Sequence, residues 1–408
     1  MNPNPVIGVF YHWLGGLASG SFYVPYRGVK RWAWETFWLA GGFFSWIIAP
    51  WFLALLMTRD LLPVLHETRG TVLFWTFFFG LLWGVGGLTF GLTMRYLGLS
   101  LGMAVVLGLC AAFGTLMPPI FRGEFVTQVV GTTSGRVILF GIFVCLLGIA
   151  AAGLAGIYKE RAMTPEQQKV TIKEFDLKKG VGVAVLSGVM SACFAYGLAV
   201  GDPIKALTIK HGTPNLWQGL PVLVVLLLGG FTTNFIWCVV LNIRNKTGYQ
   251  YFSTSSREPD GQSQDETIIE TAVDAPSREV VEHMTSAKAG PRDRSSLAVQ
   301  EKPAIRKEEV RMPVPMLANY LLCALAGTTW YFQFFFYSMG ETQMGKYKFS
   351  SWTLHMASII IFSSLWGIGL KEWKGAGVQA GRLLALALAL LVGSTVIVGY
   401  GNYLGLSH

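Results

Sequence analysis

The sequence has little charge for its length. Only 13% of its 408 residues are Asp, Glu, Lys or Arg, whereas an average soluble domain carries roughly a quarter. Hydrophobic residues make up 52% of the chain, and the mean hydropathy is +0.47. One soluble core could not bury this many apolar side chains, so we expect an integral membrane protein in contact with a lipid bilayer.

The usual sequence signatures of enzymes are also missing. There is no Gly-rich phosphate-binding loop with a Lys, and no cluster with metal-ligand spacing. Five cysteines lie inside apolar runs, which indicates small buried hydrophobes: Cys110, Cys145, Cys193, Cys238 and Cys323. We therefore expect no enzyme, no metal and no cofactor. The net charge of +9 does not indicate a nucleic-acid partner, because the basic residues lie in connections between apolar runs.

Long apolar runs are what the sequence has instead. About 20 residues of helix cross the hydrocarbon layer, and ten runs approach or exceed that length: 6–26, 34–57, 72–96, 99–120, 136–157, 180–200, 216–243, 314–339, 350–370 and 378–403. The first run has no basic residues before it and no cleavage site after it, so we interpret it as a retained helix. The prediction is an all-α integral membrane protein with ten transmembrane helices.

Two sets of matches suggest that five helices are duplicated. Residues 14–22 and 186–194 share the frame Leu-x-Gly-x-x-Ser-x-x-Phe, and Glu, Gly-Arg and Gly positions of 124–148 return in 372–393. Because five is odd, the second copy must be inverted, as in many secondary transporters with a midplane site. The expected fold is thus a five-plus-five inverted repeat.

This repeat divides the chain into predicted regions. Residues 1–158 form the first repeat and 159–179 a basic cytoplasmic connector, while 180–243 and 312–408 form the second repeat. Residues 244–311 are rich in Ser, Asp, Glu, Arg, Gln and Pro, which predicts a disordered cytoplasmic insert. Most Lys and Arg residues follow odd-numbered runs. The positive-inside rule then places these connections in the cytoplasm and both termini outside.

Ionisable residues inside the runs are few, so each one is a candidate for function. His12 lies about 9 Å into the first helix at about 1.5 Å per residue, and His355 lies similarly deep in the ninth. Tyr331 and Gln333 of the eighth helix have comparable depth. These four residues could line one polar pocket for a sugar or polyol, with imidazole carrying a proton. The alternative is a pair of histidines that only bond neighbouring backbone.

Two further features bear on this pocket. Trp330 begins an aromatic run that ends at Tyr337, and sugars pack their C–H faces on such rings. Glu35 begins the second span, where a carboxylate either favours the helix dipole or couples a proton.

Six stretches together resemble a known family: Tyr11–Gly15, Lys30–Thr36, Phe90–Gly98, Trp330–Tyr337, Leu354–Met356 and Leu370–Trp373. They are similar to the L-rhamnose–proton symporter family, within the drug/metabolite transporter superfamily of ten-helix inverted repeats. The resemblance implies proton-driven uptake of a deoxyhexose, L-rhamnose foremost, across a bacterial-type inner (plasma) membrane. It also places His12, Glu35, Gln333 and His355 within family motifs.

The chain departs from the family pattern in two places. Gly87 and Thr89 stand where the family has asparagines in the third helix, which removes amide partners for sugar hydroxyls. The connection between the seventh and eighth helices is also longer.

We therefore expect secondary active sugar symport by alternating access. Trp330, Tyr331, Gln333 and His355 would bind the sugar, and His12 or Glu35 would carry the proton, with Na⁺ left open as the ion. Two alternatives remain from the sequence. One is a membrane receptor or sensor that signals through the insert, and the other is a metabolite exporter of the same fold.

Overall fold

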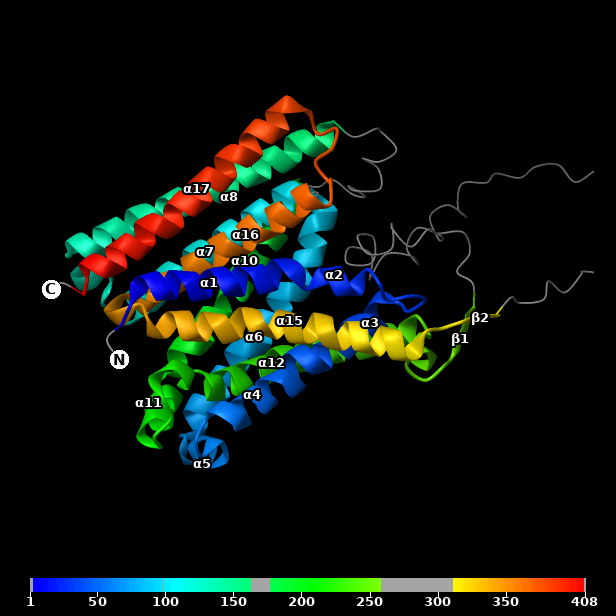
Figure 1. The fold of residues 1–408 in the computed structure, drawn as a ribbon, viewed down its shortest axis with the longest axis horizontal. Helices are drawn as coiled ribbons and strands as arrows, with labels where there is room; N and C mark the ends of the chain where they lie inside the picture. Colours follow the sequence, from blue (N-terminus) through cyan, green and yellow to red (C-terminus); the bar gives the residue numbers. More distant parts are fainter. Residues whose placement is uncertain (1–2, 98, 163–176, 258–310, 407–408) are drawn as a thin grey trace, which may run out of the picture.

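The computed structural model of the protein describes residues 3–97, 99–162, 177–257 and 311–406 (Figure 1). The first half contains α1 (Pro5–Ser21), α2 (Tyr23–Tyr26), α3 (Trp34–Phe43), η1 (Phe44–Ile48), α4 (Ala49–Met57), α5 (Leu61–Glu67), α6 (Gly70–Leu97), α7 (Leu99–Phe121), η2 (Phe125–Val130) and α8 (Thr133–Arg161).

The second half repeats this helical character. It contains α10 (Leu177–Val200), α11 (Asp202–Lys210), η3 (Asn215–Trp217), α12 (Leu220–Arg244), η4 (Gly248–Tyr251), α15 (Met316–Thr342), η6 (Gly345–Ser350), α16 (Ser351–Gly369) and α17 (Gly377–Leu404). One short antiparallel pair joins β1 (Ser255–Arg257) to β2 (Arg311–Pro313).

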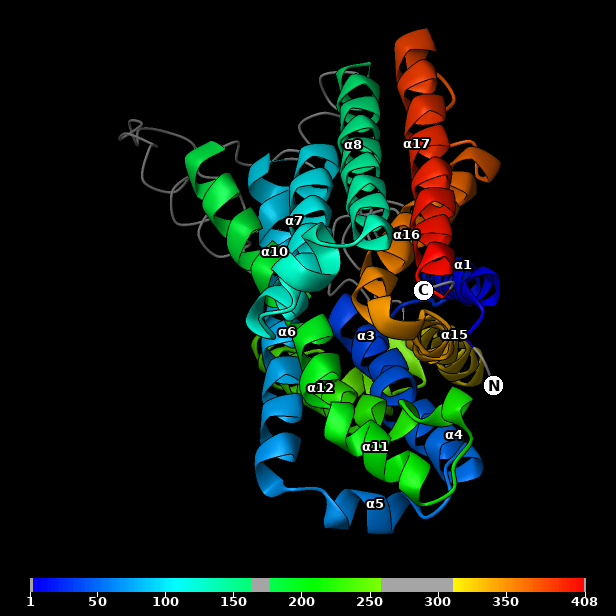
Figure 2. The same ribbon diagram turned by 90° about the vertical axis from the view of Figure 1, so that its left-hand side faces the viewer.

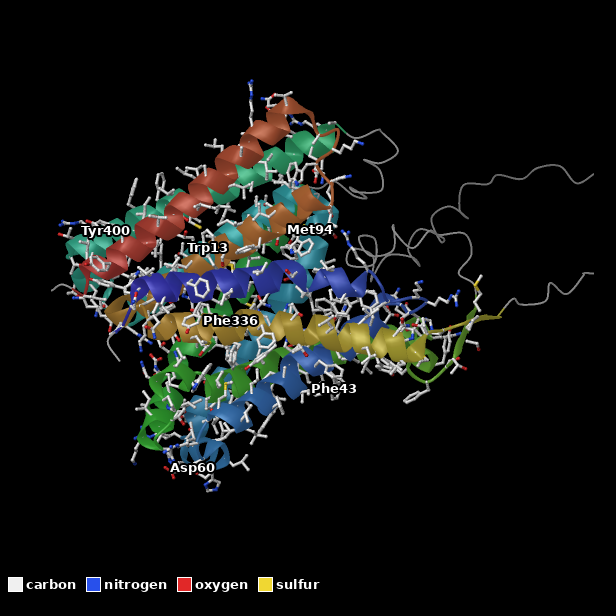
Figure 3. All side chains as sticks on the ribbon, viewed as in Figure 1. Trp13, Phe43, Asp60, Met94, Phe336 and Tyr400 are labelled. Atoms are coloured by element: carbon white, nitrogen blue, oxygen red, sulfur yellow. The ribbon has the colours of Figure 1, made fainter. Side chains whose placement is uncertain are left out.

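Helices occupy all ten apolar runs of the sequence. Within the described residues, eight helical segments are long and apolar enough to cross a membrane by length and composition. The segments formed by α1 with α2 and by α15 are not among those eight. Apolar side chains also face outward, since Phe43 of α3 and Tyr400 of α17 are 45% and 56% exposed (Figure 3). The protein is therefore an all-α, multi-pass membrane protein.

The second apolar run is continuous but not uniform. Pro50 lacks an N–H and cannot donate to the carbonyl of Trp46, one turn earlier. The chain widens into the π-helical turn η1 just before this proline and then continues as α4. Such turns shift the helical register, and this one carries the buried Trp46.

The helices pack in pairs that draw on both halves of the chain. α8 lies along α17, α6 contacts α10 and α12, and α1 contacts α15 and α16 (Figures 1 and 2). α7 contacts α8 and α10, α16 contacts α17, and α15 contacts α3. Glycines allow the closest approaches: Gly80 of α6 faces the backbone of Leu226, and Gly229 of α12 faces that of Phe77.

The connections gather at two opposite ends of the bundle. We call one end the insert face; it holds residues 27–33, 97, 99–100, 159–161, 245–257 and 370–376 (Figure 1). There Arg27 pairs with Glu372 at 2.9 Å, and Lys159 lies over the Trp373 ring. The other end, the terminal face, holds both termini, residues 58–69, 122–132, 201–219 and 343–350 (Figure 1). The described parts of the connections after odd-numbered runs thus lie at one end.

Part of the predicted insert 244–311 is ordered. α12 continues to Arg244, η4 follows, and β1 pairs with β2. Residues 258–310 of that range, on which the receptor alternative depends, lie outside the described residues, as do 163–176 of the predicted connector.

Glycine packing between α6 and α12 gives a first prediction. A methyl group at Gly80 would collide with the Leu226 carbonyl, whereas one at Gly87 of the same helix would meet nothing within 4 Å. Gly80→Ala should destabilise the protein by about 1–3 kcal/mol through overpacking, while Gly87→Ala should be neutral or stabilising. Thermal unfolding of both variants in detergent measures this; equal melting temperatures would contradict the packing.

His211 gives a pH-dependent prediction at the terminal face. Its ring nitrogens lie 3.3 Å from Glu67 and 3.3 Å from Asp60, and these carboxylates, Glu67 first, raise the pKa of His211. The raised pKa means that the contact stabilises the fold fully below about pH 6.5 and is lost as pH rises through the raised value.

We therefore expect His211→Asn to lower the melting temperature at pH 5.5 and to match the parent protein at high pH. The matched control is His66→Asn, at an exposed position of α5. A deficit of the His211 variant that grows with pH would refute the assignment.

Candidate substrate and proton site

Two histidines from distant parts of the chain meet around one tyrosine. His12 of α1 and His355 of α16 are both 0% exposed, and Tyr337 of α15 is 4% exposed. The Tyr337 ring centroid lies 5.2 Å from that of His12 and 5.2 Å from that of His355, edge to face in both cases. Three helices therefore bring two titratable rings to a shared aromatic neighbour.

Small residues make this meeting possible. A methyl group at Gly15 would come within 2.8 Å of the Gln333 carbonyl oxygen, and one at Gly340 would come within 2.8 Å of His12 Nε2. Ser358 Oγ donates either to the His12 carbonyl, at 2.9 Å, or to the His355 carbonyl, at 2.8 Å. The small-residue face of α1 is thus the surface on which α15 and α16 pack.

The imidazole nitrogens of this pair are buried and unpaired. Among the described residues, neither nitrogen of His12 or His355 has a hydrogen-bond partner in the protein. The Tyr331 hydroxyl and Ser338 Oγ share this property. Burying a polar group without a partner is costly, so such groups require an explanation. One explanation is that a polar ligand or a proton binds to these atoms when the protein functions.

An aromatic core borders the histidine pair. We use this name for Trp46, Trp83, Phe194, Trp330, Phe334 and Trp352, which come from η1, α6, α10, α15 and α16. Phe334 stacks on Phe194 at 4.0 Å and lies 5.2 Å from Trp330. It also lies 5.8 Å from the His355 ring. The core therefore connects Trp330 to the histidine pair by ring contacts.

A narrow crevice opens on the other side of Trp330. Its lining consists of Phe22, Tyr26, Trp38, Gly42, Ser45, Trp46, Gly327 and Trp330. Its free volume is about 10 Å³, which is close to the minimum for one water molecule. A monosaccharide can occupy this region only after the surrounding helices have moved apart.

The structure brings some of the predicted site residues together and separates others. His12 and His355 both contact Tyr337, His355 also borders the aromatic core that contains Trp330, and Gln333, 4% exposed, lies one turn before Tyr337 on α15. Tyr331 lies on another side of α15, where its ring neighbours are those of Phe332 and Phe335.

Glu35 is far from the histidine pair, at the insert face. Its carboxylate accepts hydrogen bonds from Asn245 Nδ2 at 3.1 Å and Thr247 Oγ1 at 2.7 Å. These partners belong to the segment that follows α12, so Glu35 fastens the start of α3 to that segment.

The sequence shows the aromatic run from Trp330 to Tyr337, but the predicted site residues did not include Tyr337 or, apart from Trp330, the aromatic core. One signal was available: Trp330, Phe334, Tyr337 and Glu341 are spaced by four, three and four residues, which places them on one helix face. No comparable spacing identifies Trp83 or Phe194, because they reach the core from other helices.

Comparison with known proteins decides the family. A family described as L-rhamnose-proton symport protein matches residues 1–254 and 297–404. The chain belongs to this symporter family. The resemblance found in the sequence is thereby confirmed, and so is the prediction that the chain is not an enzyme, since the symporter family consists of transporters.

Relatives in the symporter family cover nearly the whole chain. A protein of Yersinia pestis (strain Pestoides F) is 31% identical over 403 residues, which are 98% of this chain and 99% of the relative. Proteins of Salmonella gallinarum and Pectobacterium atrosepticum are each 32% identical, covering 97% and 98% of this chain and equal shares of their own length. All three are named L-rhamnose-proton symporter.

Phe194 provides a test of the aromatic core. It is 0% exposed and lies between the rings of Phe334 and Trp352. Phe194→Ala should cost about 3–5 kcal/mol of stability by leaving a cavity. Phe140→Ala on α8, where the ring is 57% exposed, should cost far less. Thermal unfolding in detergent compares them, and similar losses would argue against a packed core.

Proposed function

We propose that this protein takes up L-rhamnose together with a proton by alternating access. Membership of the symporter family supports the substrate class and the coupling. The observation that carries the proposal is the pair of fully buried histidines, with unpaired nitrogens, whose rings both contact that of Tyr337. Imidazole changes charge near neutral pH, so a shielded pair next to aromatic rings can link a proton to a sugar.

We also propose that the fold is a ten-helix, five-plus-five inverted repeat. In this repeat, α1, α3, α6, α7 and α8 of the first half correspond in order to α10, α12, α15, α16 and α17 of the second. Exchanging each helix for its counterpart converts four observed contacts into four other observed contacts: α6–α10 into α15–α1, α7–α10 into α16–α1, α6–α12 into α15–α3, and α7–α8 into α16–α17. The α8–α17 contact maps onto itself. A twofold relation between the halves produces this pattern, and alternating access uses it by rocking one half against the other.

The direction of the helices supports inversion. α1 starts at the terminal face and leads to α2, whereas its counterpart α10 starts at the insert face and leads to α11 (Figure 1). Because the connections after odd-numbered runs hold most of the Lys and Arg residues, we place the insert face in the cytoplasm and both termini outside. The membrane would be a bacterial-type inner (plasma) membrane.

The sugar would sit where the aromatic core meets the histidine pair. Trp330 offers a ring face to sugar C–H groups, while Gln333 and His355 offer polar partners to hydroxyls. Tyr331 would join them after the helices move, since its buried hydroxyl has no partner among the described residues. His12 would hold the proton, with Glu35 as the alternative carrier, and Na⁺ is the alternative ion.

Uptake by reconstituted vesicles tests the proposal. An inward proton gradient should drive accumulation of labelled L-rhamnose, and a protonophore should abolish it, whereas a Na⁺ gradient should have no effect. His12→Gln should reduce gradient-driven accumulation at least tenfold, because the buried proton acceptor is lost, while exchange of L-rhamnose across the membrane continues. Glu35→Gln should keep gradient-driven accumulation.

The reverse pattern in these two variants would assign the proton to Glu35. His66→Gln, at an exposed position of α5, is the matched control. Symport is refuted if wild-type uptake ignores the proton gradient.

A further inference from the structure

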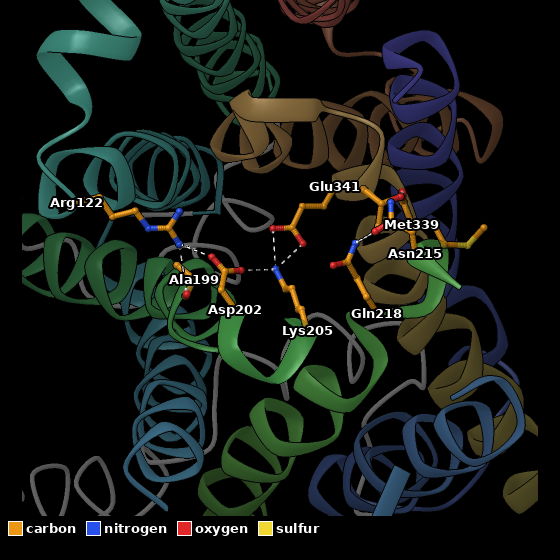
Figure 4. Close-up of polar contacts among 9 residues, drawn as sticks. Arg122, Ala199, Asp202, Lys205, Asn215, Gln218, Met339 and Glu341 are labelled. Atoms are coloured by element: carbon orange, nitrogen blue, oxygen red, sulfur yellow. Dashed lines mark hydrogen bonds and ion pairs between the residues drawn. The ribbon is translucent and has the colours of Figure 1, made fainter. Parts of the chain in front are cut away.

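A chain of four charges closes the terminal face near α15 (Figure 4). Glu341, in the last turn of α15, accepts bonds of 3.0 and 2.8 Å from Lys205 Nζ of α11. Lys205 also pairs with Asp202 at 3.1 Å, and Asp202 pairs with Arg122 at 2.6 Å. Arg122 NH2 is also within hydrogen-bond distance of the Ala199 carbonyl, at 3.3 Å. Positive and negative charges alternate along this chain and balance.

The innermost pair of this chain is well shielded from water. The Lys205 side chain is 4% exposed and that of Glu341 is 13% exposed. A lysine this deeply buried is rare unless it is paired. Losing one partner of such a pair leaves an uncompensated buried charge, which is far more costly than losing an exposed pair.

The position of Glu341 links this chain to the histidine pair. Glu341 lies four residues beyond Tyr337 on the same face of α15, and Tyr337 contacts both histidine rings. The preceding residue, Gly340, lies against His12 Nε2. Glu341 is therefore the carboxylate between the histidine pair and the terminal face along α15.

Two further charged groups act on Asp202. Arg122 approaches Asp202 from the end of α7, and Lys348 of η6 acts on it electrostatically. The described groups that act on Glu341 include Lys205 from α11 and Tyr337 from its own helix, and His12 of α1 lies against the preceding residue, Gly340. A proton on Glu341 would leave Lys205 with Asp202 as its remaining partner.

We propose that Glu341 is a second proton-binding residue of the transport cycle, and that its ion pair with Lys205 holds the terminal face closed until Glu341 takes up a proton. The reason is linkage: a proton on Glu341 removes the negative charge that attracts Lys205. Proton binding therefore favours the state in which α11 and α15 have separated. This inference rests on the proposed symport and adds a place where the proton acts on the helices.

The insert face has a comparable but weaker ion pair. Arg27 and Glu372 also join the end of the first helix of one half to the end of the fourth helix of the other, as Asp202 and Arg122 do at the terminal face. Their side chains are 49% and 43% exposed, and exposed pairs contribute little. This pair supplies a matched control, because its removal changes charge but no buried contact.

The test uses the double variant Lys205→Gln with Glu341→Gln, reconstituted in vesicles with labelled L-rhamnose. Removing both charges leaves no unpaired buried ion between them. We expect gradient-driven accumulation to fall at least tenfold, and exchange to continue with a pH profile flatter than that of the wild type. The control Arg27→Gln with Glu372→Gln should keep wild-type accumulation and pH profile. The inference is overturned if the double variant matches the control.

Hydrogen–deuterium exchange of the same variants gives a second measurement. The double variant lacks the ion pair between α11 and α15, so exchange in residues 202–210 should be faster than in the Arg27→Gln, Glu372→Gln control at the same pH. Equal protection of α11 in the two would overturn the inference. Wild-type uptake that ignores the proton gradient would instead refute symport, and the exchange data would still report on the ion pair.

Discussion

The close contact of α1 with α15 and α16 is the constraint on which the site depends. Gly15 and Gly16 let the backbones of α15 and α16 approach α1 so closely that larger side chains would not fit. The same approach buries the nitrogens of His12 and His355 without protein partners. In a bilayer, water does not reach such groups freely. The packing that makes the fold compact therefore also leaves polar atoms without hydrogen-bond partners at its centre. The contact of α1 with α15 and α16 thus shapes both the fold and the candidate site.

Around that contact the molecule is organised in three layers along the expected membrane normal. Polar and charged contacts gather at the insert face and the terminal face, and an apolar, aromatic middle separates them (Figure 1). The described contacts at the terminal face include the buried Lys205–Glu341 pair, whereas Arg27–Glu372 at the insert face is exposed. A closed middle, with a buried ion pair at one end and an exposed one at the other, fits a transporter in which the buried ion pair must be broken before that end can open.

Much of this arrangement could be predicted from the sequence. Long apolar runs predicted the long helical segments to within about four residues at each end, because run length and the scarcity of charge determine where a chain can cross lipid. The short helices α5 and α11 were not predicted. The scarcity of ionisable residues inside such runs pointed to His12 and His355, and the family resemblance then placed both within family motifs. The described parts of the connections after odd-numbered runs also lie together at one end, as expected for a chain that crosses repeatedly.

What the sequence did not predict depends on long-range contacts. Nothing local indicates that Lys205 lies against Glu341, because the two are 136 residues apart. Tyr331 and Gln333 are near neighbours in sequence but face different sides of α15. Their similar depth in the helix was therefore not sufficient to predict that both line one pocket. Glu35 looked like a coupling candidate because it is acidic and starts a span, and its fastening by Asn245 and Thr247 required the fold of the segment after α12.

The β1–β2 pair has a practical consequence. Arg257 and Arg311 are opposite one another in the ladder, so the long connection that leaves β1 returns to β2 within one interstrand spacing, about 5 Å. The anchor points of that loop are therefore as close as those of a tight hairpin. A rigid carrier domain with adjacent ends can be spliced there as a fiducial for electron microscopy, with its orientation set by two strands.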